Sequence, residues 1–260
     1  MKTIAKIITT FIVGTLFFTA CGKDDNSQIP REKRLKTIEV KDEKTDTIVG
    51  TLNYFYDTEN RISKIGLKDQ NQINFYSIEF TYNTANNVEN IRYIMQNVYI
   101  DYTYTYTANN SVPTKLKSSG NSSAISYTAE IINNNGTLFW DDYKGDVCVL
   151  ENVNSESNTF GSLNLNGLII KFKENNQFKN GLVQKQDMVK LPLLISSSGG
   201  ILIPFITSYS LQISSAAIER IEASSGEVLN YQLEKDADGY ITNSKFTSQG
   251  NTLIAMFYYE

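Results

Sequence analysis

Apolar and polar residues alternate along the first half of the chain. Between Ile48 and Tyr56 the apolar side chains recur at even spacings, with mostly polar residues between them. A period of two places such side chains on one face of a β-strand. The same pattern predicts strands over residues 35–40, 47–56, 62–68, 73–82, 88–96 and 98–107.

A twelve-residue unit at residues 54–65 combines two of these strands with a polar turn from Asp57 to Asn60. Aspartate caps its own backbone in turns, and asparagine tolerates a positive φ. After the turn, Ile62 and Ile65 are three residues apart before alternation resumes, which predicts a β-bulge. Degenerate copies of the unit occur at residues 80–91, 104–116 and 233–246.

The spacing of these copies predicts the fold class. We expect an all-β protein, a large, curved, mainly antiparallel meander sheet of repeated hairpins with at most one or two short helices. A β-sandwich is the alternative.

Two later stretches give weaker patterns. Residues 214–221 are predicted to form a short helix, because Ser214 or Ser215 can cap it and Ile218 and Ile221 are three residues apart. A further hairpin bend is predicted at Asn175 and Asn176. Residues 191–206 are apolar but interrupted by serine and glycine, so they form either two buried arms and a turn or a mobile lip over a ligand groove.

Composition excludes several kinds of activity. The 260 residues contain no histidine, the commonest general base and metal ligand near neutral pH. No Gly-rich phosphate loop, nucleophile elbow or Cys-x-x-Cys pair is present, so no cofactor is expected. The formal net charge of −4 and the lack of a basic patch argue against a nucleic-acid partner.

The N-terminus has the features of a lipoprotein signal. Lys2 and Lys6 precede an apolar run over residues 7–18, which ends in small residues before Cys21. The segment from Phe18 to Cys21 resembles the bacterial lipobox, in which the cysteine is acylated. We expect a signal peptide at 1–20, a lipidated flexible tether at 21–34 and a single β-rich domain at 35–260. The alternative, a transmembrane anchor, fits poorly because the run is short.

Three charged residues follow the cysteine. Lys23, Asp24 and Asp25 resemble the export signal that sends Bacteroidota lipoproteins across the outer membrane. The resemblance implies a protein held by its lipid in the outer membrane and exposed at the cell surface. The alternative is an ordinary solvated tether on the periplasmic face.

A stripe of tyrosines is the candidate ligand site. Tyr102, Tyr104 and Tyr106 share one face of the predicted strand, while Asp101 and Thr103 share the other. Exposed tyrosines can stack on sugar rings. The alternative is that the stripe is the buried face of the sheet.

No metal site or catalytic residue is predicted. Asp141 and Asp142 point to opposite faces of a strand, and the segment from Asp236 to Gly239 lacks the glutamate of a calcium loop, which favours a turn. Cys148 lies in an apolar run and is expected to pack in the core.

Several of these motifs together resemble a known group. They are the hairpin unit of residues 54–65, the Leu-Asn-Leu-Asn stretch at 163–166, and residues 231 and 238–241. They are similar to Bacteroidota outer-membrane lipoproteins of unknown function, whose hairpins resemble the tyrosine-aspartate units of Rhs-type repeat proteins. The resemblance implies a curved antiparallel sheet and supplies no catalytic residue.

The expected function is therefore non-catalytic binding of an extracellular glycan or other polymer. The alternative is a structural or assembly role with an envelope protein as partner. A glycoside hydrolase or lyase based on two carboxylates is a third hypothesis.

Overall fold

The computed structural model describes residues 32–108, 110–121, 126–142, 144–151, 161–165, 168–182, 192–193, 195, 216–248 and 250–260. Lys33–Glu260 forms one compact unit. The predicted signal peptide, Cys21 and the export signal Lys23, Asp24 and Asp25 lie outside the described residues.

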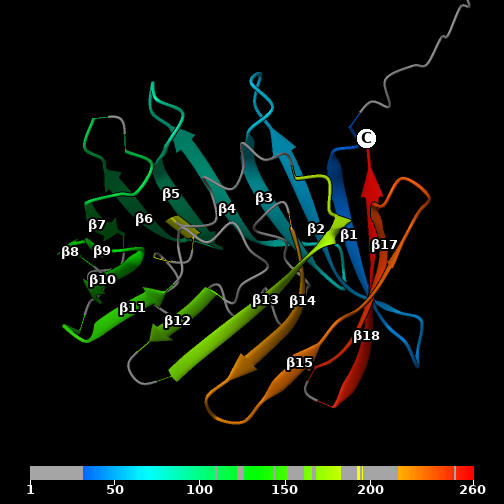
Figure 1. Cartoon of the computed structure of the whole chain (residues 1–260). Coiled ribbons are helices and arrows are strands. Elements are labelled where there is room, and N and C mark those ends of the chain that lie inside the picture. Colours follow the sequence, from blue (N-terminus) through cyan, green and yellow to red (C-terminus); the bar gives the residue numbers. More distant parts are fainter. Residues whose placement is uncertain are drawn as a thin grey trace, which may run out of the picture. The chain divides into compact units, whose positions relative to one another are not determined.

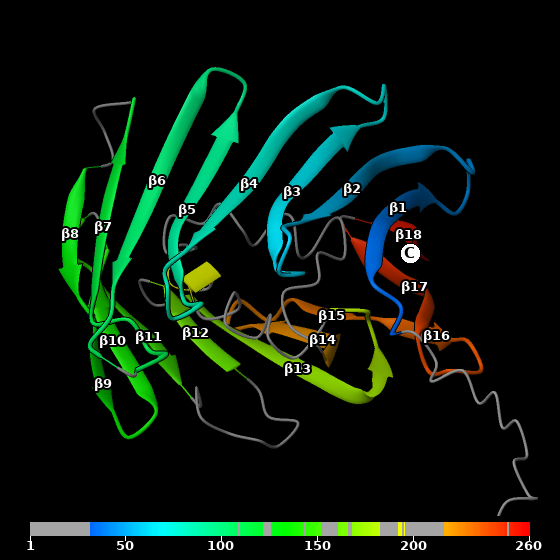
Figure 2. The same ribbon diagram turned by 90° about the horizontal axis from the view of Figure 1, so that it is seen from above.

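Among the described residues, eleven strands form the larger sheet, and each pairs with its neighbours in antiparallel fashion (Figures 1 and 2). Their order across the sheet is β16 (Gln232–Lys235), β17 (Ile241–Ser248), β18 (Asn251–Tyr259), β1 (Leu35–Asp42), β2 (Ile48–Tyr56), β3 (Ile62–Asp69), β4 (Asn74–Tyr82), β5 (Val88–Met95), β6 (Val98–Thr105), β7 (Lys115–Gly120) and β8 (Tyr127–Glu130). Strands β1 to β8 are neighbours in chain order. The predicted all-β meander is confirmed.

Seven further described strands form a smaller antiparallel sheet. Their order is β15 (Val228–Asn230), β14 (Ala216–Ala223), β13 (Leu168–Lys179), β12 (Gly161–Leu165), β11 (Val147–Glu151), β10 (Thr137–Asp141) and β9 (Ile132–Asn134). The chain passes between the sheets at both edges through a single buried residue, Ile131 between β8 and β9 and Tyr231 between β15 and β16.

The apolar faces of both sheets contribute to one contiguous core of described side chains. Ile78, Tyr93 and Tyr102 enter it from the larger sheet, and Leu138 and Trp140 enter it from the smaller one. The rings of Tyr93 and Tyr102 meet edge to face with centroids 5.6 Å apart, a favoured aromatic geometry. The alternating apolar positions of the sequence are therefore the positions that face this core.

The hairpin turns have the predicted chemistry. The Asp57 Oδ1 atom accepts hydrogen bonds from the backbone N–H groups of Glu59 and Arg61, both at 2.9 Å. Asn60 has a φ of 62°, a left-handed conformation that asparagine adopts more readily than most residues. Asn83 and Asp236 cap the corresponding turns in the same way.

The predicted β-bulge is present after these turns. Tyr56 pairs with Ile62 while Phe55 pairs with Lys64, so Ser63 is an extra residue on β3. Equivalent register shifts make Glu89 the extra residue on β5 and Thr242 the extra residue on β17. The three-residue apolar step in the sequence is thus the trace of a bulge.

Neighbouring hairpins are joined at their turns by a tyrosine and an arginine. The Tyr82 hydroxyl donates to the carbonyl of Ile62 at 2.6 Å. The Arg61 guanidinium lies over the Tyr82 ring, 4.3 Å from its centroid, and donates to Asn86 Oδ1 at 2.6 Å. The same hydroxyl-to-carbonyl bond joins Tyr56 to Leu35, Tyr106 to Val88 and Tyr259 to Ile241.

Two local predictions are wrong. Residues 216–221 of the predicted helix lie in strand β14, and Asn175 and Asn176 lie within β13 and form no hairpin bend. Lys173 pairs with Arg220 and Glu174 with Ile218, so Glu219 is an extra residue. This bulge produces the three-residue spacing of Ile218 and Ile221 that resembles a helix.

Of the apolar segment 191–206, only Pro192, Leu193 and Ile195 are described; their backbone is helical, and Leu193 and Ile195 are fully buried. The described part agrees with buried packing, and the remainder of the segment lies outside the described residues.

Candidate functional site

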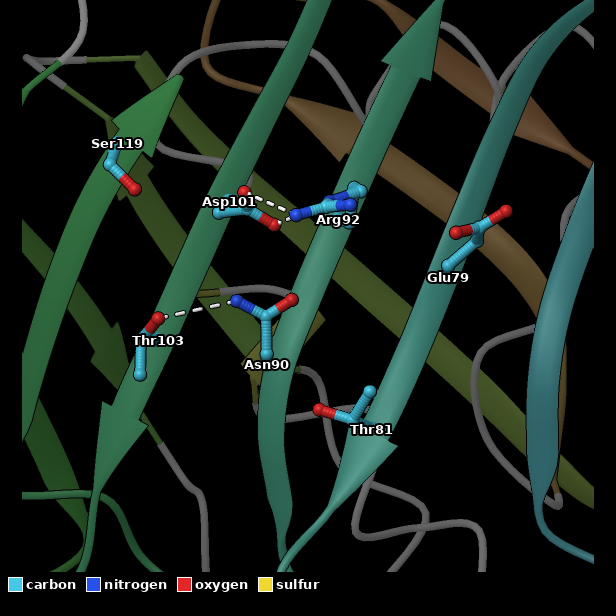
Figure 3. A pocket seen from close by; sticks show the side chains of 7 residues that line it. All are labelled: Glu79, Thr81, Asn90, Arg92, Asp101, Thr103 and Ser119. Carbon is cyan, nitrogen blue, oxygen red and sulfur yellow. Dashed lines mark hydrogen bonds and ion pairs between the residues drawn. The ribbon is translucent and has the colours of Figure 1, made fainter. Parts of the chain in front are cut away.

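A polar pocket opens on the face of the larger sheet that points away from the core, which we call the outer face. It has a volume of about 350 Å³ and is lined by residues of β4, β5, β6 and β7 (Figure 3). The lining side chains are all polar: Glu79, Thr81, Asn90, Arg92, Asp101, Thr103 and Ser119. They occupy the strand positions between the core residues, as the period of two requires.

Strand register arranges the lining residues in two rows that cross the strands. One row runs from Glu79 to Arg92 to Asp101 to Ser119, each directly opposite the next. The second row, Thr81, Asn90 and Thr103, lies one pleat away. Directly opposed side chains are close enough to interact, so each row brings its polar groups together across neighbouring strands.

The central contact of the pocket is a forked ion pair between Arg92 and Asp101. Arg92 Nε donates to Asp101 Oδ1 at 2.8 Å, and Nη2 donates to Oδ2 at 2.9 Å (Figure 3). The hydrogen bonds to Asp101 raise the pKa of the Arg92 guanidinium further. The same guanidinium lies 5.0 Å from the ring centroid of Tyr99. Two parallel hydrogen bonds fix the planes of both groups, which gives the pocket a defined geometry.

Three more of the lining groups take part in hydrogen bonds. Lys64, on β3, donates to Glu79 Oε1 at 2.8 Å. Asn90 Nδ2 donates to the Thr103 hydroxyl at 3.2 Å, so its carbonyl oxygen is oriented as well (Figure 3). The pocket therefore presents amide, carboxylate, guanidinium and hydroxyl groups that can exchange hydrogen bonds with a hydroxylated ligand.

The tyrosine stripe lies on the opposite face of the same strands. Tyr102 is 1% exposed and Tyr104 is 3% exposed, and the Tyr104 hydroxyl donates to the carbonyl of Pro192 at 2.7 Å. Tyr106 is half-buried, packs against the core and donates to the carbonyl of Val88. Because strand alternation turns these rings toward the core, the prediction that they form an exposed ligand site is wrong, and the alternative of a buried face is correct. Asp101 and Thr103, between the tyrosines, are the residues that line the pocket.

Acidic residues elsewhere serve as turn caps. Asp142 Oδ1 accepts hydrogen bonds from the backbone N–H groups of Lys144 and Asp146 at 2.7 and 3.0 Å. Within the described residues, no group of three or more acidic, cysteine or histidine side chains could hold a metal ion. Cys148 is buried, and burial together with the nearby Asp142 carboxylate raises the pKa of its thiol to about 12.

No helix in the described part of the chain is long and apolar enough to cross a membrane.

Two solved structures are similar to this chain. One is a porin-like protein from Bacteroides uniformis, with a TM-score of 0.49 and 12% identity over 87% of this chain and 98% of that one. The other is a porin-like protein from Bacteroides vulgatus, with a TM-score of 0.40 and 10% identity over 88% and 99%. No protein-family model and no curated protein sequence matches the chain. Likenesses at this level say nothing about what this chain does.

Proposed function

We propose that this protein is a lipid-anchored outer-membrane protein of the cell surface that binds an extracellular glycan or related polymer without catalysing a reaction. The location is supported by the sequence around Cys21 and by the export-like residues Lys23, Asp24 and Asp25. Acyl chains on Cys21 would hold the protein at a membrane, with about 0.8 kcal/mol for each buried CH₂ group.

The binding role is supported by one observation, the pocket on the outer face. Its polar groups are fixed by cross-strand hydrogen bonds, such as those from Arg92 to Asp101 and from Asn90 to Thr103. Binding sites typically combine a concave surface with a few positioned polar groups. Groups that are already ordered lose little conformational freedom when a ligand binds.

Two carboxylates, Glu79 and Asp101, line the same pocket, as the hydrolase hypothesis requires. Each carboxylate is engaged by a cation, Glu79 by Lys64 and Asp101 by Arg92. A glycosidase needs one carboxyl group that donates a proton to the leaving oxygen. Two ion-paired carboxylates suit hydrogen bonding to a ligand better than proton transfer, so we favour binding alone.

A specific observation also favours the assembly role as a second candidate. Met95 and Val98 are directly opposed at the end of the β5–β6 hairpin and both are exposed. Exposed apolar residues that lie together can mark protein contacts. This pair is small compared with a typical interface, so glycan binding remains the first candidate.

Affinity electrophoresis tests the proposal. The full chain, purified in detergent, is run through native gels that contain different polysaccharides. We expect at least one polysaccharide to retard the wild-type protein and Arg92→Ala and Asn90→Ala to reduce the apparent affinity about tenfold. Lys245→Ala, which removes an ion pair with Glu43 elsewhere on the larger sheet, is the matched control. Equal retardation of all four proteins, or none with any polysaccharide, would contradict the proposal.

A further inference from the structure

An exposed aromatic ring lies beside the pocket. Tyr99 is on the outer face of β6, two residues before Asp101, and its side chain is directly opposite that of Ile94 on β5. The residue is 37% exposed. Its ring is next to the Arg92 guanidinium, so the aromatic surface and the polar lining of the pocket are continuous.

The position of Tyr99 is fixed by its neighbours. Its backbone N–H donates to Asn121 Oδ1 at 3.0 Å, and Asn121 Nδ2 donates to the carbonyl of Asn97 at 2.6 Å. Asn121 thus ties the start of β6 to the segment that follows β7. The backbone that carries the Tyr99 ring is therefore ordered, and a binding surface is most effective when its supporting groups are themselves ordered.

The charges of the pocket indicate which ligands it can take. Glu79 and Asp101 line the pocket as carboxylates and Arg92 as a guanidinium, and Lys64 pairs with Glu79 from β3, so two negative groups are balanced by two positive ones. Nε and Nη2 of Arg92 already donate to Asp101. A ligand carboxylate or sulfate would have to compete with Glu79 and Asp101 for cations that these residues already pair, an unfavourable exchange. Hydroxyl groups can donate to carboxylates at no such cost.

We propose, building on the proposed function, that the site includes Tyr99 and selects an uncharged sugar chain over an anionic one. One sugar ring lies against the Tyr99 ring through its apolar face. Hydroxyl groups of this ring and of the next sugar units donate to Asp101 and Glu79 and exchange hydrogen bonds with Asn90. The aromatic ring provides apolar contact area at little entropic cost, and the carboxylates exclude uronic-acid and sulfated polymers.

The test measures equilibrium binding of the full chain in detergent to two sets of polymers. One set is neutral (a β-glucan, a mannan and an arabinoxylan), and the other is anionic (polygalacturonate and dextran sulfate). We expect the protein to bind a neutral polymer. The affinity should change little between low and high NaCl, because an uncharged polymer forms no ion pair that salt could screen. Tyr99→Ala should weaken this binding about tenfold, and Tyr99→Phe should retain most of it.

Tyr258→Ala is the matched control, because Tyr258 is a similarly exposed tyrosine on β18, away from the pocket. Preferential binding of the anionic set, lost in Arg92→Ala and weakened by salt, would overturn the charge selection and leave the proposed function standing. Neutral binding that Tyr99→Ala does not change would overturn the role of Tyr99. Failure of both sets to bind would contradict both proposals.

Discussion

Asn60 shows how one residue can serve both its own turn and the neighbouring strand. Its backbone has a φ of 62°, and its side-chain Oδ1 accepts a hydrogen bond from Arg34 Nη1 at 2.8 Å. Asn86 repeats this arrangement with Arg61 in the next hairpin. Asparagine therefore suits this position of the repeat for two reasons: it tolerates the positive φ of the turn, and its side chain accepts a hydrogen bond from the arginine of the adjacent unit.

Substitution of Asn60 separates the two effects. Asn60→Gly keeps the left-handed conformation and loses the contact with Arg34, whereas Asn60→Ala loses the contact and strains the backbone. We expect Asn60→Ala to lower the free energy of unfolding by about 1 kcal/mol more than Asn60→Gly. Urea unfolding of both variants measures the difference. Equal stabilities would show that the turn does not depend on a positive φ.

The Asp236 turn gives a prediction about pH. The Lys33 ammonium donates to the Asp236 carboxylate at 2.6 Å, and this bond lowers the pKa of the carboxyl below its ordinary value of 3.8. A lowered folded-state pKa adds stability above the ordinary value, and this stability is lost as the pH falls through the folded-state pKa. We expect Asp236→Asn to be less stable than wild type at pH 7, by at most about 1 kcal/mol because the pair is partly exposed.

The difference in stability between wild type and Asp236→Asn should shrink as the pH is lowered from about 5 to about 2, since the wild-type carboxyl is then protonated. Urea unfolding across this pH range gives the comparison. A difference that stays constant or grows in acid would contradict the assigned role of the Lys33 contact.

Among the strands and turns, the sequence predicts best those that depend only on residues close together in the chain. The predicted ends of the first strands lie within two residues of β1 to β6, because both the alternation and the turn residues act over a few positions. The sequence predicts a helix over residues 214–221 because the bulge at Glu219 of β14 places Ile218 and Ile221 three residues apart. The pairing of β18 with β1 joins residues more than 200 positions apart, and no local pattern encodes it.

The candidate site was only partly predictable. Alternation along β6 places Asp101 and Thr103 on the face opposite Tyr102, and the tight turn between Met95 and Val98 sets Arg92 opposite Asp101. The sequence is therefore enough to place Arg92, Asp101 and Thr103 together on the outer face, provided that the face of β6 with Tyr102 is known to be buried. The burial itself depends on packing against distant segments, as in the contact of Tyr104 with Pro192, and is therefore a property of the tertiary fold.

The junction after β13 depends on a glycine. Gly181 has a φ of +73°, and its carbonyl accepts a hydrogen bond from the backbone of Leu35 at 3.3 Å. A Cβ atom at this position would lie 2.7 Å from both Leu35 N and the Tyr259 ring. We expect Gly181→Ala to destabilise the protein by about 3 kcal/mol, because backbone strain and a steric clash combine.

Gly145→Ala is the control for this substitution, since Gly145 has a similar φ of +83° but no described atom within 4 Å of the added Cβ. It should cost only about 1 kcal/mol. Denaturant unfolding of both variants makes the comparison. If both variants lost the same free energy of unfolding, the close approach of Gly181 to β1 and β18 would add nothing to the cost of the substitution.

At the scale of the whole molecule, the two ends of the compact unit meet in the row of hairpin turns. Arg34 and Glu260 exchange two backbone hydrogen bonds of 3.0 and 2.9 Å, and the Arg34 guanidinium lies over the Tyr56 ring as Arg61 lies over Tyr82. The pair formed by Arg34 and Glu260 thus lies where a further hairpin turn would otherwise join β18 to β1. The proposed tether would join β1, a strand paired on both sides by β18 and β2.

The proposed location leads to a prediction with two separable parts. Cys21→Ala should release most of the protein from the membrane fraction, because acylation is lost. Replacement of Lys23, Asp24 and Asp25 by alanine should leave the protein in membranes but protect it from protease added to intact cells. Cell fractionation and protease accessibility measure these outcomes. Membrane retention of Cys21→Ala would contradict lipid anchoring, and unchanged protease accessibility would contradict the export signal.

In the proposed function, the outer-face pocket binds a glycan and leaves it intact. Isothermal titration calorimetry of the full chain against the polysaccharide that retards it most, followed by sizing of the recovered polymer, tests both parts together. We predict a saturable heat for wild type, a loss of about tenfold or more in affinity for Arg92→Ala, and an unchanged polymer length. Identical isotherms for the two proteins would contradict the site, and a shortened polymer would show that the pocket is catalytic.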